Sequence, residues 1–505
     1  MGRLAVAAIV SMWVIPLSII INSIVPQPYM DEIFHIPQAQ HYCKGDFQSW
    51  DPMITTPPGL YYLSLAHVAA LFPGMFYLQA LSSVSEVCST VILRSVNSIL
   101  AVICSFVVYE IITCLRPALS DSKATFHAVV LALYPLHWFF TFLYYTDVAS
   151  LTAVFAMYLA CLKKKLLLSA LLGAFAVIIR QTNIVWMLFV ACTGVLDITL
   201  AHQRESVKVD DIDTLSRTTS LLPPSIAVGS NLRKRKSDRA VDNDKHLKLT
   251  TETSSTTSQS GLLDEIRQAV LTAWGMKWKL LVSFSPFVIV LLAFIAFVLL
   301  NGSVVLGAKE AHAVSPHFAQ ILYCGLVSTL AMAPVHLTLG PAVDLFRSFW
   351  KNKYLGFLQL FVALSAGFLS VHFFSIAHPY LLADNRHYTF YIWRMVIKAH
   401  WLMKYLLVPL YVYSWFSIFS ILGQKTWVLI YFLATAAVLI PTPLIEFRYY
   451  TIPFFFLMLH SDISDGRIWL LLGILFIAIN VFTIKMFLFR PFYWNHEPGI
   501  QRFIW

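Results

Sequence analysis

Residues 280–300 read LLVSFSPFVIVLLAFIAFVLL, an apolar run without a single charged side chain. A run of roughly 20 apolar residues is long enough to cross the hydrocarbon core of a bilayer as an α-helix. Similar runs recur along the chain, beginning with residues 4–25. They are continuous rather than alternating every second residue, which excludes a transmembrane β-barrel. The sequence therefore predicts an all-α, multi-pass transmembrane helical bundle with about 12–14 spans.

The overall composition also excludes a soluble protein. Hydrophobic residues make up 58% of the 505 residues and charged residues only 12%, whereas soluble domains have about 25% charged residues. A single soluble core stops growing at roughly 250–300 residues, so no soluble fold could bury this much apolar surface. The net charge of +10 does not indicate a nucleic-acid partner, because most basic residues lie beside apolar segments and fit a role in membrane orientation.

Charged residues are concentrated in one segment. Of the 62 Lys, Arg, Asp and Glu residues, 23 fall within 201–279, which is also rich in Ser and Thr. This segment has too little apolar content to fold alone, so we predict a disordered cytosolic loop. It separates an N-terminal transmembrane module, 1–200, from a C-terminal transmembrane module, 280–505.

Basic clusters predict the sidedness of the loops. If the predicted spans alternate, three clusters fall on one side: Lys163–Lys165, the 201–279 loop, and Arg347 with Lys351 and Lys353. By the positive-inside rule, that side is the cytosol. The loop 26–60, which has one Lys and four acidic residues, is then on the opposite side, together with loops 301–316 and 378–393.

The spacing of Cys and His does not indicate a metal site. Five of the seven Cys fall in or beside apolar runs, where Cys packs as a small hydrophobe, whereas Cys43 and Cys88 fall outside them and could pair. His312 and His317 are spaced wrongly for one face of a helix, and no third ligand is evident. We therefore expect no metal ion and no cofactor.

Outside the 201–279 loop, dense polar clusters all fall at predicted non-cytosolic helix ends. These clusters lie at 29–38, 144–147, 180–183, 309–320, 378–394 and 446–450. A channel would distribute polar residues through the helix centres, and a transporter would break helices at mid-membrane. The convergence of polar groups on one rim instead indicates an interfacial active site.

The residue types in these clusters indicate a class of reaction. A carboxylate can act as a general base toward a hydroxyl, and Arg, Lys and protonated His can hold a phosphate. Aromatic rings with Asn and Gln suit the faces and hydroxyls of sugars. Together these groups fit the transfer of a sugar from a lipid phosphate to a hydroxyl, a reaction for which one base suffices because phosphate leaves easily.

Several strings in these clusters resemble one protein family. They are YMDEIFHIPQAQHYC (29–43), WDPMITTPPGLYY (50–62), YYTDVASL (144–151), RQTNIVW (180–186), HPYLLADNRHYTFYIWR (378–394) and QRFIW (501–505). The Asp31-Glu32 pair resembles the acidic motif in the first luminal loop of the glycosyltransferase C superfamily. Within that superfamily, the strings resemble the terminal α-1,2-glucosyltransferases of dolichol-linked oligosaccharide assembly.

The resemblance implies a glycosyltransferase C fold in the endoplasmic reticulum membrane, with the active site facing the lumen. It implies an inverting enzyme of protein N-glycosylation that takes dolichyl-phosphate glucose as donor and the diglucosylated dolichyl-diphosphate oligosaccharide as acceptor, in contact with membrane lipids. One segment departs from the family pattern, because Ala308 stands before Lys309 where an acidic residue is expected.

The residue types and the resemblance together nominate the site residues. We predict Asp31 as the catalytic base and Glu32 as the alternative, since adjacent helical residues seldom face the same site. Residues predicted to bind the donor phosphate are Arg386, His387, Arg448 and Lys309. Residues predicted to bind the acceptor or a sugar are Asp147, Tyr145, Gln38, Arg180, Gln181 and Asp384.

Other interpretations stay open for these residues. Either acid of the Asp31-Glu32 pair, or Asp147, could cap a helix, and Arg386 could be an interfacial anchor with its charge in water. Arg448 could simply pair with Glu446. For the whole protein, the alternatives are a multi-pass transporter or channel-regulatory membrane protein, and a mannosyltransferase of the same superfamily.

Overall fold

The computed structural model describes residues 2–73, 87–219, 261–307, 309, 315–351, 353–495 and 499–505. The chain divides into two compact units. The larger unit comprises Met1–Gly194 and Trp278–Trp505, and the smaller unit comprises Val195–Lys277. The predicted N-terminal and C-terminal transmembrane modules therefore form a single unit.

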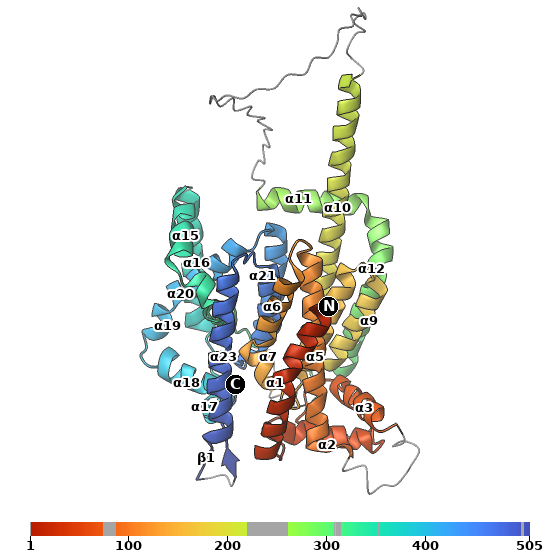
Figure 1. Ribbon diagram of the computed structural model, residues 1–505. Coiled ribbons are helices and arrows are strands. Elements are labelled where there is room, and N and C mark those ends of the chain that lie inside the picture. The colour runs from red at the N-terminus through yellow and green to blue at the C-terminus, as the bar shows by residue number, and fades with distance from the viewer. Residues whose placement is uncertain are drawn as a thin grey trace, which may run out of the picture. The chain divides into compact units, whose positions relative to one another are not determined.

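The described elements are almost entirely helical (Figure 1). The helices before the smaller unit are α1 (Gly2–Ile24), α2 (Glu32–Cys43), α3 (Gly59–Leu71), α5 (Thr90–Leu115), α6 (Asp121–Ala132), α7 (Pro135–Phe140), α8 (Thr146–Leu162), α9 (Leu166–Ile179) and α10 (Asn183–Thr219). After α11 (Leu262–Gly275), the chain continues with α12 (Lys277–Asn301), α13 (Ala319–Ala331), α14 (Ala333–His336), α15 (Leu339–Lys351) and α16 (Lys353–Phe374). The remaining elements are α17 (Pro379–Ala383), α18 (Tyr388–Ile392), η1 (Trp393–Ile397), α19 (Met403–Leu406), α20 (Val408–Ile421), α21 (Lys425–Leu439), η2 (Phe447–Tyr450), α22 (Thr451–His460), α23 (Gly466–Phe489), β1 (Phe492–Tyr493) and β2 (Ile500–Gln501).

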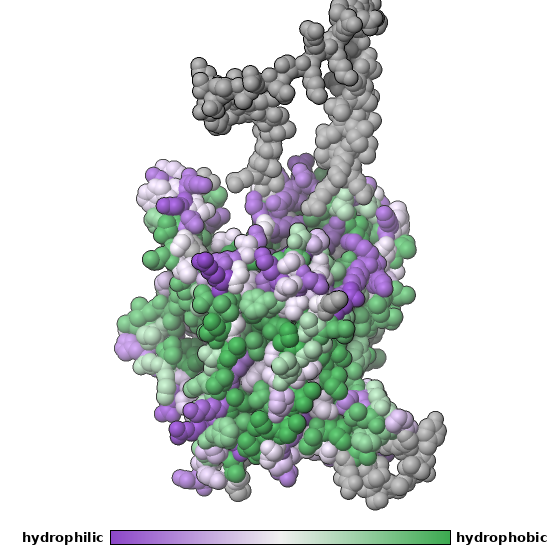
Figure 2. Space-filling view, in the orientation of Figure 1, coloured by the Kyte–Doolittle hydropathy of each residue, from purple (hydrophilic) through white to green (hydrophobic). Residues whose placement is uncertain are grey.

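Seven helices among the described residues are long and apolar enough to cross a membrane. They are Gly2–Ile24, Thr90–Leu115, Asn183–Gln203, Lys277–Asn301, Lys353–Phe374, Met403–Ile421 and Gly466–Phe489. Five shorter apolar helices accompany them. On the face of the larger unit shown in Figure 2, apolar residues cover the helix surfaces and hydrophilic residues collect near the helix ends. The predicted all-α, multi-pass membrane architecture is confirmed, while the count of about 12–14 spans stays a prediction.

Small residues allow the helices of the larger unit to pack closely. Helix α8 packs against α5 and α9, and a Cβ at Gly173 of α9 would come within 2.8 Å of Met187 Cγ and 2.9 Å of Met157 Sδ. Small residues at helix contacts let backbones approach, as is common in membrane bundles. The C-terminal helix α23 packs against α6 and α7, and Asn480 of α23 donates a hydrogen bond to the Leu133 carbonyl at 2.8 Å.

The predicted loop 26–60 is folded rather than extended. It contains α2, and α2 packs against α3. A disulfide joins Cys43, at the end of α2, to Cys88, just before α5, so the pairing that the sequence left open is present in the structure. Both sulfurs belong to a small buried cluster with Val68 of α3. The bond therefore ties the α2–α3 segment to the start of α5.

The smaller unit contains the described ends of the predicted 201–279 loop. Helix α10 continues to Thr219, and α11 begins after Gly261, whose N–H donates to the Asp264 carboxylate at 3.1 Å. Gln203 donates to Thr272 Oγ1 at 2.8 Å and joins the two helices. Residues 220–260, on which most of the disorder prediction falls, lie outside the described residues.

Candidate active site

A cavity of about 1100 Å³ lies within the larger unit. Each polar cluster predicted from the sequence contributes to its lining, through residues between 30 and 35, 145 and 150, 180 and 186, 380 and 389, and 437 and 452, and through Lys309. Apolar side chains, among them Phe294 and Val298 of α12, complete the wall. The polar rim and an apolar wall therefore belong to one cavity.

Asp31 lies in the cavity immediately before α2. The preceding residue, Met30, has a left-handed backbone conformation (φ 56°), and the Asp31 carboxylate makes no capping bond to α2. It pairs instead with Arg448 at 2.9 Å and is 40% exposed to the cavity. Burial by itself would raise the pKa of Asp31, but the charge and hydrogen bond of Arg448 lower the pKa below its ordinary value. Asp31 is therefore an ionised carboxylate that an acceptor hydroxyl could approach.

Glu32 points away from the cavity and into the protein. Its side chain is fully buried and accepts two hydrogen bonds from Arg94 of α5, at 2.8 and 2.6 Å. It also accepts the backbone N–H groups of Tyr29 at 3.0 Å and Tyr144 at 2.6 Å. With its oxygens occupied and no place in the cavity lining, Glu32 is better suited to a structural role than to the alternative role of base.

Arg448, in η2, connects three carboxylates. Besides Asp31, it pairs with Glu446 and lies 3.9 Å from Asp147. Its guanidinium also lies 5.5 Å from the centre of the Tyr145 ring. The pair with Glu446 that the sequence suggested is present, but Arg448 also holds Asp31. A phosphate group entering the cavity would meet this guanidinium beside the proposed base.

Asp147 and Gln181 line the cavity and carry oxygens that could accept further hydrogen bonds. Asp147 lies in the first turn of α8, pairs with Arg180 at 3.0 Å and is only 8% exposed. Its Oδ2 is buried and has no hydrogen-bond partner among the residues that the structure describes, as is also true of Gln181 Oε1 and Thr56 Oγ1. Buried acceptors without partners are rare in folded proteins. Hydroxyl groups of a bound sugar are suitable donors for them.

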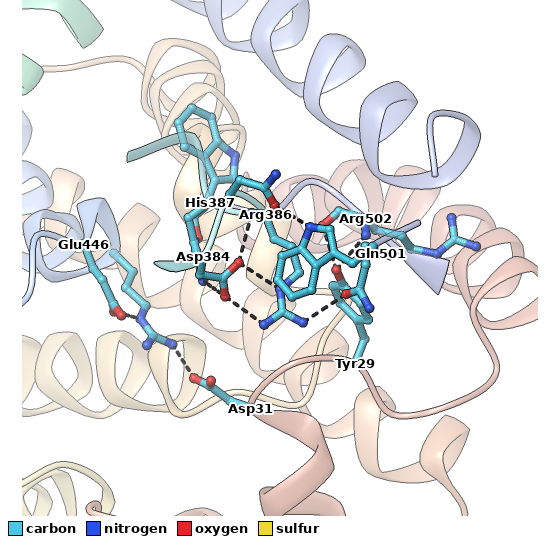
Figure 3. A network of polar contacts seen from close by, with 12 residues as sticks. Tyr29, Asp31, Asp384, Arg386, His387, Glu446, Gln501 and Arg502 are labelled. Atoms are coloured by element: carbon cyan, nitrogen blue, oxygen red, sulfur yellow. Dashed lines mark hydrogen bonds and ion pairs between the residues drawn. The ribbon is translucent and has the colours of Figure 1, made fainter. Parts of the chain in front are cut away.

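The Arg386 side chain is held in place by Asp384, Gln501 and Trp494. It donates to Asp384 from Nε at 2.9 Å and from Nη2 at 2.8 Å, and from Nη1 to Gln501 Oε1 at 3.0 Å. Its guanidinium stacks over Trp494, 4.7 Å from the ring centre. Figure 3 shows Asp384 and Gln501 on two edges of this guanidinium. Burial would raise the pKa of Asp384, but the hydrogen bonds from Arg386 lower it. The structure thus uses Asp384, predicted to bind acceptor, to orient Arg386.

Comparison with known proteins identifies the family to which the chain belongs. The DIE2/ALG10 family matches residues 25–459. The chain belongs to the DIE2/ALG10 family. It is 60% identical to a protein of Arabidopsis thaliana over the whole of both chains, and 34% identical to one of Mus musculus, covering 95% of this chain and 93% of the mouse protein. Both relatives are named "Dol-P-Glc:Glc(2)Man(9)GlcNAc(2)-PP-Dol alpha-1,2-glucosyltransferase". No solved structure matches the chain.

Membership of the DIE2/ALG10 family confirms the resemblance found in the sequence. It supports the prediction of an α-1,2-glucosyltransferase. The alternatives, a transporter or channel-regulatory protein and a mannosyltransferase, gain no support from it.

Two predicted site residues of this DIE2/ALG10-family chain differ in their relation to the cavity. Lys309 lines it and donates to the backbone and side-chain oxygens of Asn301, at 2.6 and 3.1 Å. Gln38 is buried outside it, where it donates to the Ser49 carbonyl at 2.7 Å and accepts the Asp51 N–H at 2.9 Å. Gln38 therefore shapes the 26–60 loop, and the structure does not place it at the site.

The loop that carries Lys309 is fitted against the 26–60 loop. A Cβ at Gly307 would overlap the carbonyl oxygen of Pro52, and the Leu306 N–H donates to the Thr55 carbonyl at 3.2 Å. Gln181 donates to the same carbonyl at 3.1 Å. Ala308 and His312 lie outside the described residues. Only glycine at position 307 permits this close approach of the two loops. The approach positions both loops at the cavity rim.

Several residues around the cavity were not predicted. His35 lines it, accepts or donates a hydrogen bond with the Tyr61 hydroxyl at 2.6 Å, and has a pKa lowered to about 4 by burial. Arg94 anchors Glu32. Its signal in the sequence was an arginine inside a largely apolar helix, where a charged residue is rarely found without a partner. Tyr29, Gln501 and Arg502 lie in two of the strings that carry the family resemblance, but their residue types alone did not indicate a role.

The structure offers no evident metal centre in the part of the chain it describes. No group of three or more His, Cys, Asp and Glu side chains there is arranged to hold a metal ion. The expectation that no metal is needed stays a prediction.

Proposed function

We propose that this chain transfers the last glucose, in α-1,2 linkage, from dolichyl-phosphate glucose to the diglucosylated dolichyl-diphosphate oligosaccharide used in protein N-glycosylation. Its membership of the DIE2/ALG10 family and the names of its relatives support this reaction. The observation that carries the mechanism is that one ionised carboxylate, Asp31, shares a cavity with Arg448, Arg386 and Lys309. This is the combination that transfer from a lipid phosphate requires.

On the donor side, cationic groups neutralise the phosphate. Arg386 and Lys309 line the cavity and can donate hydrogen bonds to phosphate oxygens. His387 lies in the same turn as Arg386 and also faces the cavity. The apolar wall that includes Phe294 and Val298 suits the lipid chain of the donor. The phosphate would thus lie where the polar rim meets the apolar wall.

On the acceptor side, the hydroxyl is activated by Asp31. The 2-hydroxyl of the terminal glucose attacks C1 of the donor glucose from the face opposite the phosphate. Asp31 accepts the hydroxyl proton, the new C1–O bond forms, and the bond from C1 to the phosphate oxygen breaks. Dolichyl phosphate leaves with the electron pair, and the configuration at C1 is inverted. Asp147 Oδ2 and Gln181 Oε1 accept hydrogen bonds from other acceptor hydroxyls.

We place the cavity on the luminal side of the endoplasmic reticulum membrane. The Cys43–Cys88 disulfide lies at the far end of the helix that follows Asp31, and disulfides persist in oxidising compartments such as this lumen. Helix α8 carries Asp147 in its first turn, and Lys163–Lys165 follow its other end. The positive-inside rule assigns that other end to the cytosol.

We expect the reaction to need no cofactor. The donor is already activated as a phosphate ester, and Arg and Lys side chains supply the positive charge that the phosphate needs. Transfer should therefore proceed at an unchanged rate in EDTA. Loss of activity that only a divalent cation restores would contradict this.

Purified protein tests the proposal directly. The protein is incubated with a synthetic dolichyl-phosphate glucose analogue and the diglucosylated lipid-linked oligosaccharide, and the product is measured by mass spectrometry. A product heavier by one hexose, with an α-1,2 linkage, supports the proposal. Dolichyl-phosphate mannose serves as the competing donor. Preferential transfer of mannose, or no transfer from either donor, would overturn it.

A further inference from the structure

The segment 499–505 runs beside the loop that carries Arg386. The Ile504 N–H donates to the Arg386 carbonyl at 2.9 Å, and the Tyr388 N–H donates to the Ile504 carbonyl at 3.1 Å. His387 and Ile504 thereby form a parallel β-bridge. Gln501, Arg502 and Ile504 are all buried. The segment is thus joined to the Arg386 loop by an isolated β-bridge at Ile504.

Two further contacts reach the side chains that face the donor. Gln501 Oε1 accepts a hydrogen bond from Arg386 Nη1 at 3.0 Å, on the edge of the guanidinium that Asp384 leaves open. The Trp505 carbonyl lies 2.9 Å from His387 Nδ1. A carbonyl oxygen can only accept, so Nδ1 carries the proton and donates it. The segment therefore fixes the guanidinium plane of Arg386 and orients the His387 ring with Nδ1 toward the Trp505 carbonyl.

A third set of contacts joins the segment to the loop of the proposed base. The Tyr29 hydroxyl donates to the Arg502 carbonyl and accepts from the Arg502 N–H, each at 2.7 Å. The Arg502 side chain donates to the Phe487 and Leu488 carbonyls near the end of α23, at 2.8 and 2.9 Å. Figure 3 shows Arg502 and Gln501 beside Tyr29, with Asp31 on the same loop. Only Met30 separates Tyr29 from Asp31 in the sequence.

We propose that residues 501–505 act as a positioning strap of the active site. The strap holds Arg386 and His387 in the geometry that binds the donor phosphate, and it fixes their distance from the Asp31 loop. This inference rests on the proposed function, because it assigns the strap to the donor phosphate. The amide of Gln501 is uncharged, so it orients Arg386 without adding a second carboxylate beside Asp384 that would repel a phosphate.

Two substitutions at Gln501 separate orientation from charge. Gln501→Ala removes the hydrogen bond, and Gln501→Glu keeps the shape but adds a negative charge beside Arg386. We expect donor KM to rise about tenfold in Gln501→Ala, a loss typical of one hydrogen bond to a charged group, and further in Gln501→Glu. Acceptor KM should not change. Gln40→Ala is the matched control, because Gln40 donates to the Cys88 carbonyl outside the cavity.

A substitution at Tyr29 tests the link to the Asp31 loop. Tyr29→Phe removes both bonds to Arg502, and we expect kcat to fall about fivefold with donor KM unchanged. Tyr323→Phe is the control, because the Tyr323 hydroxyl bonds Ser375 at 2.7 Å outside the cavity. A purely structural strap would lower the yield of folded protein but leave KM and kcat per folded molecule at wild-type values. That result for both Gln501 variants and Tyr29→Phe would overturn the inference.

Binding of a short-chain polyprenyl phosphate distinguishes failure of the strap from failure of the proposed function. If the wild-type protein binds this probe but transfers no glucose, the proposed function is wrong. The Kd of the probe then tests the positioning role of the strap. This Kd should rise about tenfold in Gln501→Ala and further in Gln501→Glu. Equal Kd values in the wild type and both variants would overturn the strap. A wild type that neither transfers nor binds would overturn both.

Discussion

Arg94 and Glu32 form an ion pair at 2.6 Å in which the side chains are only 1% and 0% exposed. Arg94 also donates to Asn22, to the Val25 carbonyl and to the Gln27 carbonyl. The pair therefore joins the end of α1, the turn before α2 and helix α5. Asp31, the residue immediately before Glu32, is turned into the cavity by the same arrangement. Two adjacent acids thus have opposite surroundings, one buried in the protein and one facing the site.

Replacement of the proposed base should stop transfer without unfolding the protein. In Asp31→Asn we expect kcat to fall about 100-fold to 10,000-fold, the usual contribution of a general base. Underglucosylated precursor should accumulate in cells. The matched control is Asp46→Asn, because Asp46 lies in the same loop outside the cavity and accepts the Gln48 and Ser49 N–H groups, as an Asn oxygen can also do. Full activity of Asp31→Asn would show that Asp31 is not the catalytic base.

Breaking the Arg94–Glu32 pair should affect stability more than chemistry. Arg94→Gln and Glu32→Gln each leave a buried charge without its partner, which costs about 3–5 kcal/mol. Replacing both residues by apolar residues of similar size should cost less than either single change. Thermal unfolding in detergent measures the effect. If Glu32→Gln had wild-type stability but no activity, Glu32 rather than Asp31 would be the better candidate for the base.

Removal of Arg448 should change the pH dependence of the reaction. In the wild type, Arg448 lowers the pKa of Asp31 below 3.8, so the carboxylate stays ionised as the pH falls from 7 to 5. In Arg448→Gln, burial remains while the cation is gone, and the pKa of Asp31 should rise. The acid side of the kcat/KM profile should then move to higher pH. Arg347→Gln, on an exposed side chain, is the control, and identical acid limbs in Arg448→Gln and the wild type would refute this account.

The Cys43–Cys88 disulfide should stabilise the protein without taking part in catalysis. It closes a loop with a sequence separation of 45, and its removal by Cys43→Ser with Cys88→Ser should cost about 3–4 kcal/mol. Neither Cys lines the cavity, so activity at low temperature should persist. In sealed microsomes treated with a permeant reductant, an impermeant maleimide should label these two Cys only after the membrane is opened. Labelling before opening would place the Asp31 loop in the cytosol.

Much of the site was predictable because polar residues are rare in this chain. Charges at helix ends such as Asp147, Arg180 and Arg448 stand out against apolar runs. The basic clusters orient the alternating spans, and this orientation predicts that all three residues lie on the non-cytosolic side. The spacing of Asp31 and Glu32 predicts that only one of them faces the site. The spacing does not decide which one, because that depends on where Arg94 of α5 lies in space. The position of Gln38 outside the cavity could not be predicted for a similar reason, since its partners Ser49 and Asp51 are set by the folding of its own loop.

The strap of residues 501–505 has a consequence for how the enzyme is made. A ribosome builds the chain from its N-terminus, so Tyr29, Asp31, Arg386 and His387 have all been synthesised before the residues that fasten them together. The contacts that join Arg386 and His387 to the Asp31 loop can therefore form only late in folding, once residues 501–505 have been added to the chain.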